Sequence, residues 1–140
     1  MEITTEAIIQ APVSTIWKAI TNTDEMRLWY FDMNGFRVEE GVVFTFVGQG
    51  KEAGTTYVHR CEVKEVIENK KLTYTWTYDN LPGTSYVTFD LDEQGQKTLV
   101  RLTHSGVESF SANGSDFQPE NFREGWNYII NTSLKNFAEN

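Results

Sequence analysis

A single amphipathic segment closes the chain, and the residues before it, from 36 to 106, alternate between apolar and polar types. In the closing segment, apolar residues recur at spacings of three and four, as they do on one face of an α-helix. The residues on this face are Phe122, Trp126, Ile129, Ile130, Ser133 and Phe137. A helix with one apolar face must bury it, and the alternating segments are the surface that the chain offers. The sequence therefore predicts a helix from Pro119 to about Ala138 lying on an antiparallel sheet.

The alternating segments have the two-residue period of strands with one buried face. Short turns separate them, and we place three of these turns at residues 48–54, 81–83 and 92–96. Strands joined by short turns favour antiparallel neighbours. The residues that we predict to face the core are Phe44, Phe46, Tyr57, His59, Cys61, Val63, Leu72, Tyr74, Trp76, Val87, Phe89, Leu91, Val100, Leu102 and His104.

The start of the chain adds one strand and two short helices. Residues 2–10 alternate as a strand, and Pro12 suits the first turn of a helix. Apolar residues at helical spacing between Val13 and Ile20 give that helix a buried stripe. We expect Thr23 to cap a second helix, which ends near Trp29.

These elements predict an α+β fold in one domain over residues 1–140. The order is one strand, two short helices, further antiparallel strands and one long helix, which indicates a curved sheet of six or seven strands around the C-terminal helix. A chain of 140 residues can bury a sizeable core without disulfides or metals. The single cysteine, Cys61, excludes an internal disulfide.

The charge balance restricts the partners of the protein. The net charge is −8, from 12 basic and 20 acidic residues, and no long basic run offsets it. Nucleic acids and anionic membranes both attract dense positive charge, so neither is an expected partner. No segment approaches the roughly 20 apolar residues of a membrane span, and the first residues do not form a signal peptide. We therefore expect a soluble, cytoplasmic protein.

Four segments carry a resemblance to a known superfamily. They are IIQAPVSTIWKAITNTDEMRLWY near the start, KKLTYTW at residues 70–76, TLVRLTHSG at residues 98–106 and EGWNYIINTSLKNF in the closing helix. In this order they resemble the START and birch-pollen-allergen-like superfamily, also called SRPBCC. Within it, the chain is most similar to homologues of the activator of the ninety-kilodalton heat-shock protein's ATPase. We expect no counterpart of the separate N-terminal domain of the eukaryotic co-chaperones, and Asp24 is not followed by the usual proline.

The resemblance implies the helix-grip fold, in which the sheet grips the long helix and often leaves a cavity. It implies a protein that binds a small hydrophobic or amphipathic ligand, such as a lipid, in that cavity. The first alternative is a co-chaperone-like module that binds another protein. The second alternative is a cavity enzyme of the polyketide cyclase or dehydratase type. Oligomeric state stays open.

We expect the cavity to lie between the predicted inner face of the sheet and the apolar face of the long helix. The residues that we expect to line it are Trp29, Phe44, Phe46, Tyr57, His59, Cys61, Tyr74, Trp76, Phe89, His104, Trp126, Ile130 and Ser133. Aromatic stripes of this kind also fill ordinary cores. Two small residues in the helix, Gly125 and Ser133, are explained either by close approach to the sheet and room for a cavity, or by large neighbours.

Chemistry in this cavity would rest on histidine. His104 and His59 are the candidates for a general acid or base, since imidazole titrates near neutral pH. The sequence contains no nucleophile motif, paired carboxylates or phosphate-binding loop, so binding is favoured over catalysis. His59, Cys61 and His104 lack a fourth ligand at a spacing typical of zinc sites. We expect neither a metal nor a cofactor.

Overall fold

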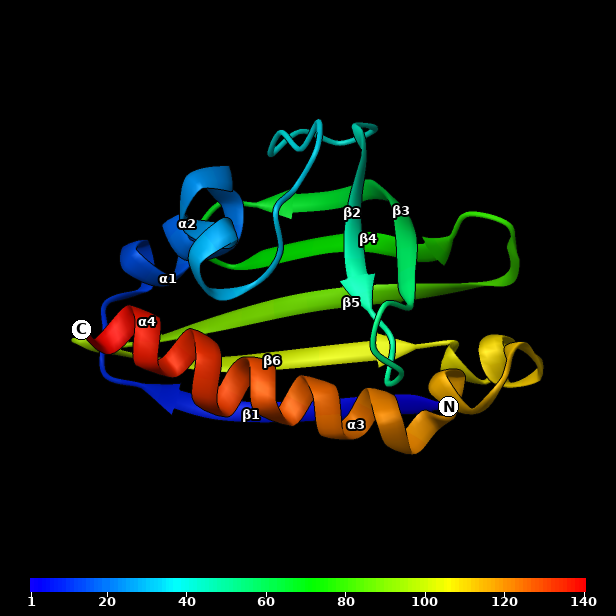
Figure 1. Cartoon of the computed structure of the whole chain (residues 1–140). Coiled ribbons are helices and arrows are strands. Elements are labelled where there is room, and N and C mark those ends of the chain that lie inside the picture. Colours follow the sequence, from blue (N-terminus) through cyan, green and yellow to red (C-terminus); the bar gives the residue numbers. More distant parts are fainter.

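The structure is a computed structural model that describes all 140 residues. Six antiparallel strands form one curved sheet in the order β1-β6-β5-β4-β3-β2, and the C-terminal helix runs alongside β1 and β6 (Figure 1). The strands are β1 (Glu2–Ile9), β2 (Val43–Gln49), β3 (Thr56–Ile67), β4 (Lys71–Tyr78), β5 (Leu81–Gln94) and β6 (Lys97–Ser105). This is the helix-grip arrangement that the sequence predicted.

The inner face of the sheet matches the alternation in the sequence. Along β1, every second residue is buried, beginning with Ile3, and β4 buries every second residue from Leu72 to Tyr78. The registers place Phe46 opposite His59 and His59 opposite Tyr78, so three neighbouring strands bring aromatic rings together. Because side chains alternate across a strand, one residue of register shift would have turned these rings outward.

Two short helices, α1 (Val13–Thr21) and α2 (Thr23–Trp29), lie at the end of the sheet that carries the C-terminus (Figure 1). The N-cap of α2 is Asn22, whose side-chain oxygen accepts a hydrogen bond from the Glu25 amide. Our prediction of Thr23 as the cap was therefore wrong by one residue. Asn caps at least as well as Thr, and local sequence alone does not choose between adjacent capping residues.

Three turns differ from the predicted ones. The turn between β4 and β5 is formed by Asp79 and Asn80, with Asn80 in the left-handed region at φ 67°, and the predicted turn residues 81–83 belong to β5. The β5–β6 turn is shorter than predicted, since β5 continues to Gln94. β2 likewise continues into the predicted loop, as far as Gln49. After β6, two short 3₁₀ helices follow, η1 (Val107–Asn113) and η2 (Ser115–Phe117).

The closing helix is continuous but not uniform. It consists of α3 (Pro119–Tyr128), a π-helical segment η3 (Ile129–Leu134) and α4 (Lys135–Glu139). Its buried residues are Trp126, Ile130, Leu134 and Ala138, each four residues after the last. The wider π turn keeps such a spacing on one face, whereas a regular α-helix would rotate it away from the sheet. Of the predicted stripe, Trp126 and Ile130 are buried, whereas Phe122, Ile129 and Phe137 are partly buried against the core. The prediction did not include the buried Leu134 and Ala138.

Ser133 lies beside the core and has a bonding role. Its hydroxyl donates a hydrogen bond to the backbone carbonyl of Trp29, at the end of α2. This bond connects the C-terminal helix to α2. Ser133 does not line the cleft described below, so the expectation that it makes room for a cavity was wrong.

No helix of the structure combines the length and apolar character needed to span a membrane.

Candidate ligand-binding cleft

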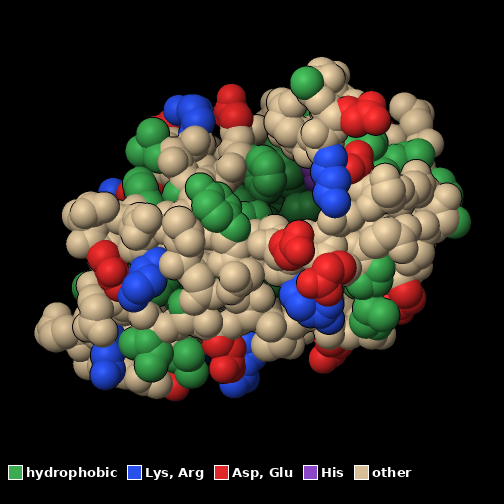
Figure 2. Space-filling model, turned by 60° about the horizontal axis from the view of Figure 1, so that its bottom comes forward, with side chains coloured by type: hydrophobic (Ala, Val, Ile, Leu, Met, Phe, Trp, Pro, Cys, Tyr) green, Lys and Arg blue, Asp and Glu red, His purple; other side chains and the backbone are tan.

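A cleft of about 510 Å³ opens between the C-terminal helix and the end of the sheet formed by β2, β3 and β4. In Figure 2 it appears as a hollow with a hydrophobic floor, a histidine inside it and charged side chains at its rim. The lining residues are Phe31, Gly48, Gln49, Gly50, Lys51, Tyr57, His59, Trp76, Tyr78, Asp116, Phe117, Asn121, Phe122, Glu124, Gly125, Trp126, Tyr128 and Ile129.

Local backbone features shape the sheet side of the cleft. A shift of register between Trp76 and Tyr78 marks a bulge in β4, and such bulges redirect side chains next to sites. At Gly48, an added Cβ would lie 2.6 Å from the His59 ring, so any larger residue would displace the imidazole. The absent side chain lets the His59 ring stack on Phe46, with centroids 4.2 Å apart.

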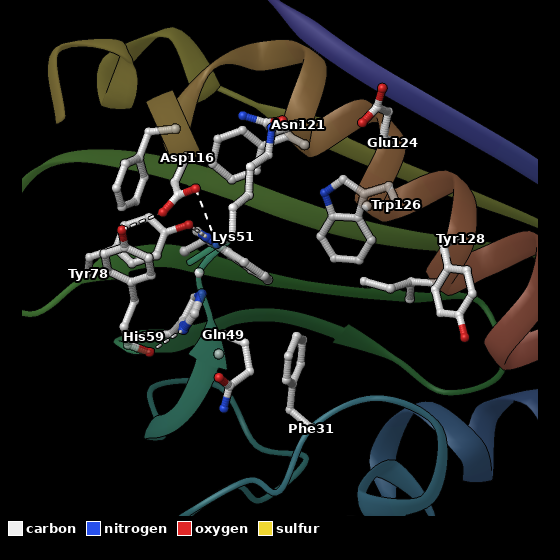
Figure 3. Close-up of a pocket in the computed structure, with 18 residues that line it drawn as sticks. Phe31, Gln49, Lys51, His59, Tyr78, Asp116, Asn121, Glu124, Trp126 and Tyr128 are labelled. Atoms are coloured by element: carbon white, nitrogen blue, oxygen red, sulfur yellow. Dashed lines mark hydrogen bonds between the residues drawn. The ribbon is translucent and has the colours of Figure 1, made fainter. Parts of the chain in front are cut away.

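The outer end of the cleft is polar, and one carboxylate there accepts two hydrogen bonds. Asp116 of η2 accepts a hydrogen bond from the Tyr57 hydroxyl at 2.7 Å and another from the Lys51 amide at 3.3 Å (Figure 3). These bonds join the β2–β3 hairpin to the segment before α3. The bond to Asp116 raises the pKa of Tyr57, so its hydroxyl remains a donor.

His59 reaches the cleft as a neutral side chain. Its Nδ1 lies 3.2 Å from the Tyr57 carbonyl, and because a carbonyl oxygen only accepts, that nitrogen carries the proton. Burial lowers the pKa of His59 to about 4, although the Phe46 and Tyr57 carbonyls oppose that effect. Near neutral pH the imidazole therefore contributes an uncharged polar edge to the lining.

His104 lies behind the cleft wall, at the centre of a chain of hydrogen bonds. The Trp126 indole N–H donates to its Nδ1 at 2.9 Å, and an indole can only donate, so the proton sits on Nε2. Nε2 donates to the Ser85 hydroxyl at 2.7 Å, and Ser85 donates to the Trp76 carbonyl at 2.9 Å. Burial lowers the pKa of His104 to about 3. Both ring nitrogens are occupied, and neither offers a proton-transfer site to the cleft.

Four of the thirteen residues predicted for the cavity line this cleft: Tyr57, His59, Trp76 and Trp126. The structure places the other nine outside the lining, and these are Trp29, Phe44, Phe46, Cys61, Tyr74, Phe89, His104, Ile130 and Ser133. All of them except the half-buried Ser133 are buried. Several have fixed partners there. The Trp29 indole donates to the Ala19 carbonyl, and the Tyr74 hydroxyl bonds to that of Tyr30. Burial also raises the pKa of Cys61, which keeps it a neutral thiol.

Sequence reasoning missed most of the lining residues that lie outside the strands. Phe31 follows α2 and Phe117 belongs to η2, where no periodic signal marks a shared site. Phe122 lies on the predicted helix face but was not assigned to the cavity. Tyr78 could have been found, because it continues the alternation of Leu72, Tyr74 and Trp76.

Gly125 is exposed at the cleft, and an added Cβ there would meet no atom within 4 Å. The expectation that it allows close approach of the helix to the sheet was wrong. A helical glycine with no packing reason costs about 1 kcal/mol relative to alanine. Without a side chain, Gly125 leaves open space on the helix side of the cleft.

The lining is mostly apolar, and its few charges do not form a metal site. It contains one cation, Lys51, and two anions, Asp116 and Glu124. No group of three or more His, Cys, Asp or Glu side chains in the structure could hold a metal ion. An aromatic cleft with a few polar groups is the usual form of a site for a small organic molecule.

Several solved structures share this fold. MLL2253 from Mesorhizobium loti is 25% identical with a TM-score of 0.76, and the match covers 98% of this chain and 96% of that one. CV1439 from Chromobacterium violaceum is 18% identical with a TM-score of 0.85, covering 99% and 97%. The Aha1 dimer from Colwellia psychrerythraea is 23% identical with a TM-score of 0.69, covering 99% and 96%.

A comparison with curated proteins gave no match. The model of one protein family, the activator of Hsp90 ATPase homolog 1-like proteins, matches residues 10–139. That match spans every helix and strand except β1. The chain therefore belongs to the family of activator of Hsp90 ATPase homolog 1-like proteins.

Proposed function

We propose that the protein binds a small hydrophobic or amphipathic molecule in the cleft between the sheet and the C-terminal helix. The observation that carries this proposal is the aromatic lining of a cleft of about 510 Å³, within the range of about 300–1,000 Å³ typical of small-molecule sites. Rings from β4, η2 and α3, including Trp76, Phe117 and Trp126, offer flat apolar contacts to such a ligand.

Binding fits the polar groups of the cleft better than catalysis does. A general acid or base needs a pKa near the working pH and a free position beside the substrate. Burial lowers the pKa of His59 to about 4, and His104 uses both ring nitrogens inside the core. The cyclase-like alternative therefore has no proton-transfer group tuned to neutral pH among its two predicted candidates.

A larger side chain at Gly125 tests whether the cleft is the binding site. Leu at this position would project into open space at the cleft and would also favour the helix, by roughly 0.8 kcal/mol over glycine. We expect Gly125→Leu to lose binding of N-phenylnaphthylamine, a neutral dye that fluoresces in apolar sites, without losing stability. The measurement is a fluorescence titration together with urea denaturation.

Asn136→Leu is the matched control, because Asn136 is exposed on α4 and does not line the cleft. It should bind the dye as the unmodified protein does. Equal binding by Gly125→Leu and the control would place the dye elsewhere and refute the cleft as the binding site. No binding by the unmodified protein, and no small molecule retained in native mass spectrometry, would favour the protein-binding alternative instead.

A further inference from the structure

One hydroxyl group in the cleft, that of Tyr78, donates no hydrogen bond. The Tyr78 oxygen accepts a hydrogen bond from the Trp76 indole N–H at 2.9 Å, but its own O–H has no partner in the structure. Tyr78 is 8% exposed and lines the cleft. Because this O–H faces the cleft, an acceptor that enters the cleft can form a hydrogen bond with it.

The other inner donors around Tyr78 are already engaged. The Tyr57 hydroxyl donates to Asp116, and the His59 Nδ1–H donates to the Tyr57 carbonyl. The Trp126 N–H donates to His104. The side chains of Gln49 and Lys51 are exposed at the outer end. The floor of the cleft thus presents one free donor among apolar rings.

The charge of the cleft disfavours an anionic ligand. Lys51 is the one cation of the lining and is outnumbered by Asp116 and Glu124, in a protein with a net charge of −8. The Tyr78 hydroxyl does not ionise near neutral pH either, since burial raises its pKa. A neutral ligand avoids both the repulsion and the cost of burying a charge.

Resting on the proposed function, we propose that the ligand is a neutral, flat aromatic compound whose carbonyl oxygen accepts a hydrogen bond from the Tyr78 hydroxyl. The rings of Trp76, Phe117 and Trp126 contact its flat faces. The Trp76–Tyr78 bond orients the donor, because the indole N–H occupies one lone pair of the phenolic oxygen. The carbonyl takes the place of the water that would otherwise meet this hydroxyl.

The test compares xanthone with xanthene, which have the same three-ring frame and differ in the carbonyl. The unmodified protein should bind xanthone about 3- to 10-fold more tightly than xanthene, as expected for one neutral hydrogen bond. Tyr78→Phe should remove this preference and leave xanthene affinity unchanged. The infrared carbonyl stretch of bound xanthone should shift to lower frequency in the unmodified protein but not in Tyr78→Phe. Tyr86→Phe, on an exposed residue of β5, is the control and should behave as the unmodified protein.

Each outcome separates this inference from the proposed function. Equal affinity for both compounds in the unmodified protein and in Tyr78→Phe would refute the role of Tyr78 while supporting a ligand cleft. Weaker binding of both compounds by Tyr78→Phe would indicate damage to the cleft and would also refute the specific bond. Tighter binding of the carboxylic acid derivative of xanthene, lost in Lys51→Gln, would overturn the neutral ligand. Binding of none of these compounds to the unmodified protein would count against the cleft itself.

Discussion

Both ring nitrogens of His104 are used inside the core, and this arrangement sets the charge of the imidazole. If the ring were protonated, its Nδ1–H would point at the Trp126 N–H, which is also a donor. The neutral form has no such conflict, in agreement with the lowered pKa. The residue joins α3 to β6 and, through Ser85, to β5 and β4. Its role at this scale is structural.

We predict that His104→Leu destabilises the fold by about 2–4 kcal/mol. The change leaves the buried Trp126 N–H without an acceptor, which costs about 1–3 kcal/mol. It also removes one of the two hydrogen bonds of the Ser85 hydroxyl, at about 0.5–1.5 kcal/mol. His104→Gln should cost less, since an amide can accept and donate in similar directions. Urea denaturation of the two variants measures the difference. A loss below 1 kcal/mol for His104→Leu would contradict the structural role.

The C-terminal helix shows how one element serves both the core and the cleft. Its π segment keeps Ile130 and Leu134 on the sheet after Trp126, whereas Gly125 and Tyr128 lie at the cleft. Ser133, in the same segment, bonds to the Trp29 carbonyl. A π turn can therefore position this element against the sheet and against α2 at once.

Ser133→Ala tests that connection. Removing the hydroxyl should lower the free energy of unfolding by about 0.5–1.5 kcal/mol, the usual contribution of a neutral hydrogen bond. Thr132→Ala, at the exposed neighbour, is the control. Chemical denaturation compares the two. Should Ser133→Ala prove as stable as the control, the bond to Trp29 would contribute nothing measurable.

For the whole molecule, the two buried histidines predict a loss of stability in mild acid. Their pKa values are lowered in the folded state, to about 4 for His59 and about 3 for His104, from 6.5 in the unfolded chain. Below pH 6.5 the unfolded chain binds protons that the folded protein does not, so stability falls as pH falls. In this range, each histidine should lower the free energy of unfolding by about 1.4 kcal/mol for each pH unit of acidification, until the pH reaches its folded-state pKa.

Urea denaturation at pH 7, 6 and 5 measures this slope. The carboxylates with lowered pKa, Asp79, Glu108 and Glu139, titrate below this window in the unfolded chain, with ordinary values of 3.8 to 4.5. The His104→Gln variant should reduce the slope to about half of its original value, since one histidine remains. A flat profile between pH 7 and 5 would show that neither histidine is held neutral by the fold.

Much of the fold followed from periodicity, because local rules suffice where one face of an element is buried along its length. The alternation in β3, β4 and β6 correctly placed His59, Trp76 and His104 inward. Turn and cap positions were less predictable. Asn22 and Thr23 are both good caps, and the choice depends on how α2 meets α1.

The cleft was less predictable than the core, since all the candidate residues share the same apolar character. Whether a ring fills the core or lines a cleft depends on what lies opposite to it. Phe44 meets Tyr74 with centroids 5.3 Å apart and is enclosed, whereas Trp76 and Trp126 have the open end between β2 and α3 beside them.

The sequence by itself determined the element order, the inward face of each strand and the negative charge of the protein. These properties arise from residues close together along the chain or from a simple sum. Only the tertiary structure decided that His104 is bonded on both sides, that Gly125 borders open space and that the Tyr78 O–H has no acceptor. Such outcomes depend on distances between residues far apart in sequence, and no local pattern records those distances.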